Sequence, residues 1–348
     1  MEISEKTLQA LGFARAEKIE KGWSCDVKYR AETAEGEAYL LRITPFEKSA
    51  SRADMFRMQK EADALGIPMC RPLRFGECEE GVYSVQTWIN GEDAEEALPL
   101  LPDVEQYLYG LEAGRILRKL HTIPAPEDQP DWAVRFNRKI DRKIEMCRAC
   151  PIQFDGAEKM IEYINENRHL LNGRPQSFQH GDYHIGNMMI ENGKLVIIDF
   201  DRYDFGDPWE EFNRITWCAR KSPYMATGLI NGYFEGGAIP EEFWRLLALY
   251  LYNNMLSSVA WAMDFGQKEI DTQLGLAKQI MEWYGDVTRI VPTWYMGQVY
   301  VQWTDGVPYR LKEPFDFSFL KKYGKVFKVY DDQDSGNICF GVEKDGER

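Results

Sequence analysis

The sequence lacks the features that mark membrane, secreted and nucleic-acid-binding proteins. Its 348 residues contain no run of eighteen apolar residues, and residues 1–6 lack the basic start and apolar core of a signal peptide. Cysteine is sparse, and the seven cysteines are too scattered to predict a disulfide framework. Positive charge is in deficit, and the formal net charge is −14. Such a charge disfavours binding to nucleic acid or to an anionic membrane. We therefore expect a folded cytoplasmic protein with reduced thiols.

The chain does contain a β-rich first part and a helical second part. Residues 23–43 alternate as two strands around a turn, residues 48–65 are good helix formers, and strand-like pieces follow at 71–77 and 82–88. Beyond residue 92 the pattern predicts helices at roughly 103–122, 131–149, 155–171, 208–220 and 239–265, and one strand at 195–198. The stretch 241–263 is apolar nearly all round, which predicts a central buried helix. The pattern indicates a small β-rich lobe, a linker near 86–92 and a large helical lobe.

One segment of the helical part carries the candidate chemistry. It contains His180, Gly181 and Asp182, then Asn187 after four intervening residues, and Asp199 directly after the short strand. Phosphoryl transfer needs a carboxylate to orient the attacking hydroxyl and oxygen ligands to hold Mg²⁺ against the phosphates. Carboxylate and amide oxygens are ligands that Mg²⁺ prefers. The segment therefore meets the requirements of a kinase.

This segment resembles the aminoglycoside phosphotransferase and choline kinase family, whose catalytic loop reads H-G-D-x-x-x-x-N and whose metal motif reads I-D-F-D or I-D-W-E. The resemblance covers roughly residues 10–290. It implies an α+β, two-lobe protein-kinase-like fold, with a small five-stranded antiparallel N-lobe, a large helical C-lobe, and ATP or GTP in the cleft with Mg²⁺. It also implies that Asp182 is the catalytic base or hydroxyl-orienting group, that Asn187 and Asp199 bind Mg²⁺, and that His180 braces the loop.

The resemblance also indicates candidate nucleotide contacts in the first part of the chain. Ser24 lies where the family has its phosphate-covering loop, and Arg42 stands where kinases usually carry a lysine in the third strand. Arginine can still donate to phosphate oxygens, with a planar fork rather than a point charge. Residues 85–91 fit the hinge, where adenine would bond main-chain groups near Thr87 and Ile89. Two helix acids remain open as partners of the strand cation: Asp54 and Glu61.

The acceptor is expected to be a small molecule with a hydroxyl group. Only about seven residues separate Asp199 from Gly206, and no A-P-E segment follows, so a protein-substrate activation loop has little room. The net charge of −14 favours a cationic acceptor. The candidate acceptor-binding acids are Asp201, Asp204, Glu210, Glu211 and Asp264. Asp207 is expected to cap the following helix instead.

A β-rich, aromatic stretch begins near residue 299, which a single kinase-like fold does not require. Residues 334–348 are similar to residues 22–37, so the end of the chain is either a truncated second kinase-like small lobe or an ordinary terminal hairpin. Its aromatic residues make self-association through this segment plausible. The predicted division is a nucleotide-binding N-lobe at 1–90, a C-lobe with the catalytic loop and acceptor site at 91–298, and an accessory segment at 299–348.

The sequence thus predicts a small-molecule O-phosphotransferase. It would transfer the γ-phosphoryl of Mg-ATP or Mg-GTP to a hydroxyl of an aminoglycoside-like or amino-alcohol acceptor. Two alternatives stay open. One is a metabolite kinase acting on choline, a sugar or homoserine, and the other is a nucleotide-binding pseudokinase with a regulatory role, motivated by Arg42 and by its undetermined helix partner.

Overall fold

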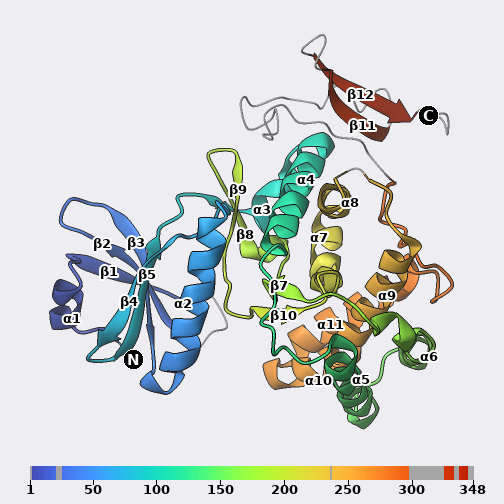
Figure 1. Ribbon diagram of the computed structural model, residues 1–348, viewed down its shortest axis with the longest axis horizontal. Coiled ribbons are helices and arrows are strands. Elements are labelled where there is room, and N and C mark those ends of the chain that lie inside the picture. The colour runs from blue at the N-terminus through green and yellow to red at the C-terminus, as the bar shows by residue number, and fades with distance from the viewer. Residues whose placement is uncertain (1, 21–25, 236, 298–324, 333–336, 344–348) are drawn as a thin grey trace. The chain divides into compact units, whose positions relative to one another are not determined.

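The computed structural model describes residues 2–20, 26–235, 237–297, 325–332 and 337–343 (Figure 1). The chain divides into two compact units. Unit 1 comprises Met1–Ala94 with Asn187–Tyr203, and unit 2 comprises Glu95–Gly186 with Asp204–Arg348. The motif segment is therefore shared, because its first part belongs to unit 2 and its last part to unit 1. The division at residues 90 and 298 stays a prediction.

Unit 1 contains the expected five-stranded antiparallel sheet, with the strand order β1-β2-β3-β5-β4 (Figure 1). The strands are β1 (Arg15–Ile19), β2 (Val27–Glu32), β3 (Ala38–Thr44), β4 (Pro72–Cys78) and β5 (Gly81–Thr87). One face buries Leu41 and Ile43 in a core with Tyr29 and Val85. Because side chains alternate along a strand, Arg42 lies on the other face, level with Lys28 of β2 and Ser84 of β5. This alternation sets the polar face of the sheet.

A second small sheet in unit 1 has the order β6-β8-β9. It consists of β6 (Glu92–Asp93), β8 (Met188–Glu191) and β9 (Lys194–Ile197). Asn192 and Gly193 join β8 to β9, with φ of 51° and 72°. Asn-Gly adopts such positive φ values readily, which makes it a common two-residue hairpin turn. The helices of unit 1 are α1 (Glu5–Ala10) and α2 (Ser49–Ala64), with the short η1 (Phe46–Lys48) between them in sequence.

Unit 2 is largely helical. Its elements after α3 (Ala94–Ala97) are η2 (Leu98–Leu100), α4 (Asp103–Leu120), α5 (Trp132–Ala149), α6 (Ala157–Asn167), η3 (Arg168–Leu171), β7 (Ser177–Gln179), η4 (Ile185–Asn187), β10 (Asp204–Gly206), η5 (Glu210–Arg214), α7 (Ile215–Lys221), α8 (Pro223–Tyr233), α9 (Glu241–Leu256), α10 (Ser258–Ala262), η6 (Met263–Phe265) and α11 (Gln267–Trp283). β7 and β10 pair as a two-stranded antiparallel sheet. No helix in the described part of the chain is long and apolar enough to span a membrane.

Helix α9 is the buried helix that the apolar stretch predicts, since Phe243, Leu246, Leu249 and Tyr252 are all fully buried. It ends at Leu256, however, and not near residue 265 as expected. The Ser258 hydroxyl donates to the carbonyl of Asn254 at 2.9 Å, and such local bonds compete with a continuing helix. The stretch is therefore divided into α9, α10 and η6. The helix expected at 208–220 is likewise divided, into η5 and α7.

Helices α4 and α8 approach closely through glycines. A Cβ at Gly110 would lie 2.2 Å from the carbonyl oxygen of Met225, and one at Gly228 would lie 2.3 Å from that of Tyr107. No side chain fits at such distances, so the glycines permit this packing. The close contact supports the loop described below, because α4 also accepts a hydrogen bond from Tyr183.

The last described elements, β11 (Lys325–Asp332) and β12 (Asn337–Glu343), form an antiparallel hairpin. The strand expected from residue 299 lies outside the described residues. The structure therefore contains a β-rich C-terminal appendage, and the choice between a terminal hairpin and a truncated second lobe stays open.

Candidate active site

In unit 1, the two candidate metal ligands lie at one end of the β8–β9 hairpin. The register pairs Met188 with Ile197, and the Ile198 N–H donates to the Asn187 carbonyl at 3.0 Å. Asp199 follows directly, with a φ of 66°. A left-handed conformation is uncommon outside glycine and is a feature of functional sites. The hairpin therefore fixes Asn187 and Asp199 together, and the Asp199 side chain is 35% exposed.

Arg42 is buried among carboxylates of unit 1. Its Nη1 lies 2.6 Å from Asp201 Oδ1 and 3.8 Å from Asp26 Oδ2, and its Nη2 lies 3.6 Å from Asp199 Oδ1. Burial opposes the charge of Arg42, but the attraction of Asp201, Asp199 and Asp26 outweighs it and raises the pKa of the guanidinium. Arg42 is therefore a permanent cation next to the candidate metal ligand Asp199.

The helix residue that joins this network is Arg52, and the sequence analysis did not single it out. Arg52 Nη2 lies 2.8 Å from Asp26 Oδ2, and its Nη1 lies 3.3 Å from Asp201 Oδ1. Two arginines thus share two carboxylates. We call these four residues the unit 1 ion-pair network: Asp26, Arg42, Arg52 and Asp201.

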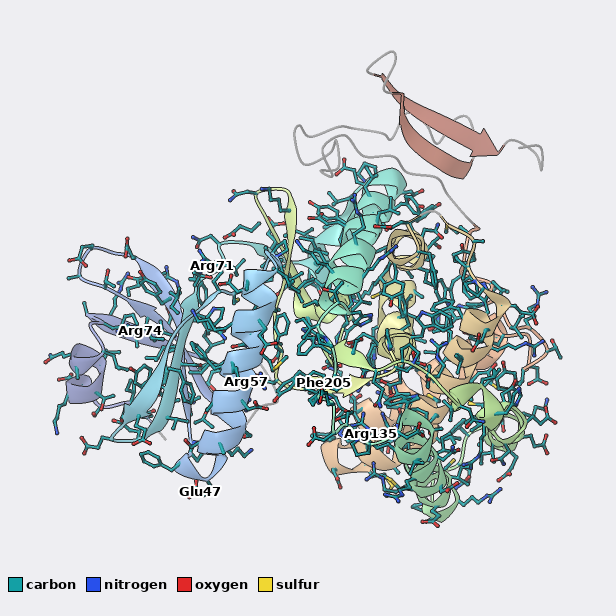
Figure 2. The ribbon with its side chains drawn as sticks, in the orientation of Figure 1. Glu47, Arg57, Arg71, Arg74, Arg135 and Phe205 are labelled. Atoms are coloured by element: carbon teal, nitrogen blue, oxygen red, sulfur yellow. The ribbon has the colours of Figure 1, made fainter. Side chains whose placement is uncertain are left out.

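The expectation that Asp54 or Glu61 pairs with Arg42 is wrong. Arg57 contacts Asp54 at 2.7 Å and Glu61 at 2.6 Å on the exposed side of α2, where Figure 2 labels it. The reason is helical periodicity, because the side of α2 that is buried carries Met55, Met58, Gln59 and Ala62. Asp54 also accepts a hydrogen bond from the hydroxyl of Tyr203.

The other candidate nucleotide residues lie elsewhere in unit 1. Lys28, which the sequence analysis missed, is level with Arg42 on the adjacent strand, and burial followed by the charge of Arg42 lowers the pKa of its ammonium. Thr87 ends β5, and its N–H donates to the Arg71 carbonyl at 3.0 Å. Ile89 is buried. Ser24 lies outside the described residues. Roles for Thr87, Ile89 and Ser24 in nucleotide binding stay predictions.

In unit 2, the loop that carries Asp182 is held by hydrogen bonds from several elements. Fully buried His180 accepts from the Asp182 N–H at 3.3 Å through Nδ1, which is the contact expected of a residue that braces the loop. The Gly181 N–H donates to both carboxylate oxygens of Glu211, at 3.0 and 3.2 Å. The Tyr183 hydroxyl donates to Ala113 of α4 at 2.7 Å. The loop backbone is therefore preorganised.

The Asp182 side chain itself lies beside a guanidinium. Arg214 Nε is 3.2 Å from Asp182 Oδ1, and His184 Nε2 is 3.6 Å from the same oxygen. His184 Nδ1 in turn accepts from the Gly186 N–H at 3.1 Å, which orients its ring. Asp182 is thus fixed by Arg214 of η5, another residue that the sequence analysis missed.

Most of the acids proposed for a cationic acceptor have partners inside their own unit. Glu211 holds the catalytic loop, and Glu210 contacts Lys139 at 2.9 Å. Asp204 contacts Arg135 at 3.2 Å, and Figure 2 shows Arg135 close to Phe205, whose carbonyl it also binds. Asp201 belongs to the ion-pair network of unit 1, and Asp264 is exposed in η6. A net charge cannot reveal such internal pairing.

Glu211 remains a carboxylate although it is buried. Burial is the largest influence and raises its pKa, but the neighbouring His121 and His180 and the Gly181 N–H together bring the pKa below its ordinary value. His121 Nε2 lies 3.9 Å from Glu211 Oε2. Glu211 is therefore an anchor of the loop.

Asp207 lies two residues before Trp209, the N-cap residue of η5, and η5 has no side-chain cap hydrogen bond, so the expected capping by Asp207 is not found. Asp207 Oδ1 accepts from the Trp209 N–H at 3.0 Å, and its carboxylate also binds Arg174 at 2.8 Å and the Tyr250 hydroxyl at 2.6 Å. The Arg174 guanidinium stacks 3.8 Å from the Trp209 ring centroid. This buried network fixes the start of η5, which carries Glu210, Glu211 and Arg214.

The candidate metal ligands fit Mg²⁺ by their chemistry. Asn187 and Asp199 offer an amide oxygen and a partly exposed carboxylate at one end of a hairpin. Among the described residues, no three His, Cys, Asp or Glu side chains form a complete metal-binding group. Mg²⁺ in kinases commonly binds one or two protein oxygens together with water and substrate phosphates, so two ligands are sufficient.

Comparisons with known proteins address the family and the fold of the chain. The model of a family described as the phosphotransferase enzyme family matches residues 15–245. The structure is similar to a thermostable mutant of the aminoglycoside phosphotransferase APH(4)-Ia in apo form, with a TM-score of 0.59 and 16% identity over 80% of this chain and 98% of that one. A comparison with curated proteins found no match.

Two further structures resemble the chain to a similar degree. A choline/ethanolamine kinase family protein from Mesorhizobium loti has a TM-score of 0.57 and 17% identity, over 83% of this chain and 95% of that one. The amicoumacin kinase hAmiN, in complex with AMP-PNP, Ca²⁺ and Ami, has a TM-score of 0.56 and 13% identity, over 83% and 96%. At these identities the likeness establishes the fold, which is the two-lobe protein-kinase-like fold.

Proposed function

Because the chain belongs to the phosphotransferase enzyme family, we propose that it is a small-molecule O-phosphotransferase that transfers the γ-phosphoryl of ATP or GTP to a hydroxyl. One observation carries this proposal. Asp182 is held beside Arg214 on a loop whose backbone is fixed by Glu211 and His180, so a carboxylate is positioned in advance to act on a hydroxyl.

Unit 1 would hold the nucleotide. Asn187 and Asp199 would bind Mg²⁺. This ion would neutralise the charge that develops on the phosphates. Arg42 stays cationic at all relevant pH values and would donate to phosphate oxygens, while Asp201 and Asp26 keep its side chain in place. Arg52 would hold the same two acids from the helix.

Unit 2 would act on the acceptor. Asp182 would accept a hydrogen bond from the acceptor hydroxyl and take its proton as the oxygen attacks the γ-phosphorus and the bond to the leaving nucleotide diphosphate breaks. Arg214 would keep the Asp182 carboxylate correctly oriented. His180 and Glu211 would support the loop without touching substrate.

The narrower acceptor class stays a proposal. Similar structures bind hygromycin B with ADP and gentamicin, which makes an aminoglycoside-like acceptor one candidate and an amino alcohol, choline, a sugar or homoserine others. The choice between ATP and GTP also needs measurement. Four of the five acids expected to attract a cation already have internal partners, so composition no longer favours one class.

A second candidate function is a nucleotide-binding pseudokinase. The observation that favours it is the ion-pair network of unit 1, because Arg42 is already satisfied by carboxylates. A regulatory protein of this kind would bind nucleotide without turning it over.

Transfer of labelled γ-phosphate separates the two functions. Wild-type protein would be incubated with ATP or GTP, with Mg²⁺ or EDTA, and with a panel of aminoglycosides, amino alcohols, sugars and hydroxy acids. We expect Mg²⁺-dependent transfer to at least one acceptor, and its loss in Asp182→Asn. Nucleotide binding by thermal shift with no transfer and no hydrolysis would instead support the pseudokinase.

A further inference from the structure

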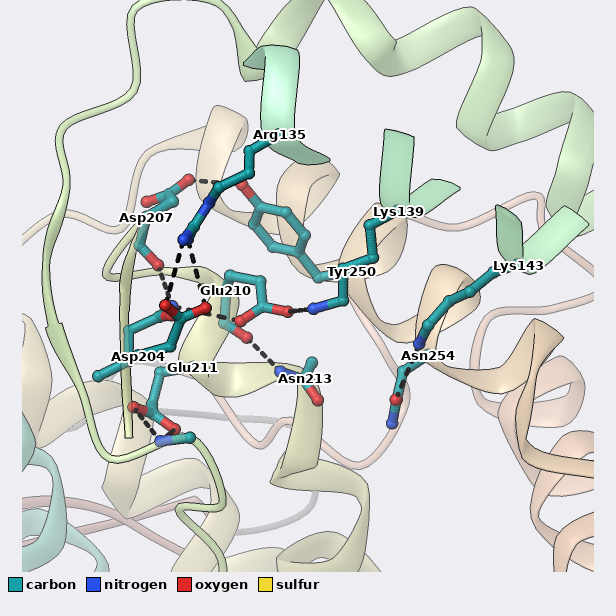
Figure 3. Close-up of polar contacts among 12 residues, drawn as sticks. Arg135, Lys139, Lys143, Asp204, Asp207, Glu210, Glu211, Asn213, Tyr250 and Asn254 are labelled. Atoms are coloured by element: carbon teal, nitrogen blue, oxygen red, sulfur yellow. Dashed lines mark hydrogen bonds and ion pairs between the residues drawn. The ribbon is translucent and has the colours of Figure 1, made fainter. Parts of the chain in front are cut away.

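Helix α5 carries three cations at intervals of four residues, so they lie along one side of the helix: Arg135, Lys139 and Lys143. The first two have carboxylate partners, at 3.2 Å from Asp204 and at 2.9 Å from Glu210. Lys143 differs. Its Nζ lies 3.5 Å from Asn254 Oδ1 (Figure 3). Among the described residues, no carboxylate oxygen lies within 4 Å of this nitrogen, in contrast to Lys139.

Lys143 is partly buried, and its surroundings are electropositive. The charged groups near it are Lys139 and Arg142 of its own helix and Glu210 and Arg214 of η5. Burial is the largest effect, the cations add to it, and together they lower the pKa of Lys143 to about 7 from its ordinary value of 10.5. A structural lysine would be expected to have an acid partner, as Lys139 does. Unpaired, strongly perturbed cations are characteristic of functional sites.

This cation is connected to the candidate catalytic loop through η5. Arg214, one of the charges near Lys143, contacts Asp182 Oδ1 at 3.2 Å. Figure 3 shows Lys139 reaching Glu210 and Lys143 reaching Asn254, with Asn213 of η5 drawn between them. Asn213 donates to the Glu210 carbonyl at 2.7 Å, which fixes η5 in this region. An anion near Lys143 would lie in the part of unit 2 that holds Asp182.

We propose that Lys143 binds an anionic group of the acceptor, a carboxylate, sulfonate or phosphate, in the same molecule that offers its hydroxyl to Asp182. Asn254 accepts from Lys143 through Oδ1, so its amide N–H groups can donate to the same anion. The anion would supply the negative charge that Lys143 lacks. The inference rests on the proposed phosphotransferase function, and it reverses the cationic acceptor that the composition favoured.

Matched acceptors test the charge preference. Each hydroxyl scaffold is offered in neutral and anionic forms: glycerol, glycerate and glycerol 3-phosphate; glucose, glucuronate and glucose 6-phosphate; and ethanolamine as a cation. We expect the preferred acceptor to be anionic. For that acceptor, Lys143→Met should raise KM at least tenfold with a smaller change in kcat, Lys143→Arg should recover most of the loss, and exposed Lys268→Met should match wild type.

The pH dependence gives a readout that a purely structural lysine would not change. Because Lys143 is cationic below about pH 7, the wild-type KM for the anionic acceptor should rise between pH 7 and 9. Lys143→Arg, which stays charged, should show a flat KM over that range. A neutral or cationic acceptor preferred by wild type, or a KM unaffected by Lys143→Met, would overturn the proposal.

A binding measurement separates this inference from the proposed function. The reactivity of Lys143 toward acetic anhydride at pH 7 is followed by mass spectrometry, with Lys268 as the internal reference. Glycerate or glycerol 3-phosphate should protect Lys143 and not Lys268, even in an Asp182→Asn protein that transfers no phosphate. If no anion protects Lys143, the anion site is wrong whether or not the protein is a kinase. If Lys143 is protected but no acceptor is phosphorylated, the proposed function fails and the site stands.

Discussion

The buried and partly buried cations of the two units have different partners. In unit 1, Arg42 and Arg52 are surrounded by carboxylates, with Asp26 and Asp201 shared between them. In unit 2, Lys143 has an amide neighbour and nearby cations. Arg42 is buried, Arg52 and Lys143 are partly buried, and the main difference lies in the partners of these charges.

The comparison teaches which charges already have carboxylate partners within the fold and which do not. A buried ion pair is strongly destabilised by removal of one partner, because the other charge is then buried alone. A buried cation without a partner already bears that cost in the native protein. Arg42 should therefore stabilise unit 1, whereas Lys143 should destabilise unit 2 until a ligand binds.

The largest expected effect on stability is that of Arg42→Met. It removes the cation that three carboxylates face, so we expect a loss of about 3 kcal/mol in the free energy of unfolding, measured by urea denaturation. The control is Arg57→Met, whose exposed pairs with Asp54 and Glu61 should contribute less than about 1 kcal/mol. Equal effects for the two variants would remove the distinction between the ion-pair network and the surface pairs.

A smaller effect of opposite sign is expected for Lys143→Met. Replacing a partly buried cation that has no carboxylate partner by an apolar side chain of similar length should stabilise the ligand-free protein by about 1 kcal/mol at pH 7. Lys268→Met, at an exposed position of α11, should change the stability by less than about 0.5 kcal/mol. A clear loss of stability in Lys143→Met would show that the ammonium has a structural partner.

The stability difference should also depend on pH. The folded-state pKa of Lys143 is lowered to about 7 from 10.5, so between these values the unfolded chain binds more protons than the folded one. Wild-type stability should therefore rise relative to Lys143→Met as the pH increases through this window, and the gain of the variant should shrink from pH 7 toward pH 10. Melting temperatures of both proteins at pH 7.0 and 9.5 test this, and a constant difference would argue against the lowered pKa.

The smallest effect is expected from removal of residues 299–348. Residues up to 297 dock on α8, since the Tyr295 hydroxyl donates to Asn231 Oδ1 at 2.8 Å and Asn231 donates to the Gly297 carbonyl at 3.1 Å. We expect turnover within about twofold of the full-length protein, because all proposed catalytic residues lie earlier. Mass measurement of both forms tests self-association through this segment. Lost activity in a folded, truncated protein would place the segment in the active site.

The sequence could predict the fold where the pattern is local. Alternation predicts β2, β3, β4 and β5, and periodicity predicts α2, α4 and α5. Strands β1, β7 and β10 are short and depend on distant partners, so local patterns could not identify them. β8 could have been found, because Asn192 and Gly193 follow an apolar run and precede a predicted strand.

The candidate site likewise contains residues that the sequence could identify and residues that it could not. Asp182, Asn187 and Asp199 stand in one short segment and could be identified from its motif. Arg52 and Arg214 could not, because their importance depends on contacts with Asp26 and Asp182 that tertiary folding creates. Lys143 could not be told apart from the many other basic residues of α5, because only the absence of a carboxylate within 4 Å, among the described residues, distinguishes it from Lys139.

The central claim is that Asp182 acts on the acceptor while Asp199 holds the metal and nucleotide. The most direct test measures kcat and the calorimetric Kd of Mg-nucleotide in Asp182→Ala and Asp199→Ala. Asp182→Ala should lower kcat by roughly 10²–10⁴-fold and leave the nucleotide Kd within about twofold, as expected for loss of a general base. Asp199→Ala should weaken Mg-nucleotide binding. Near-wild-type turnover in Asp182→Ala, or unchanged Mg-nucleotide binding in Asp199→Ala, would contradict the account.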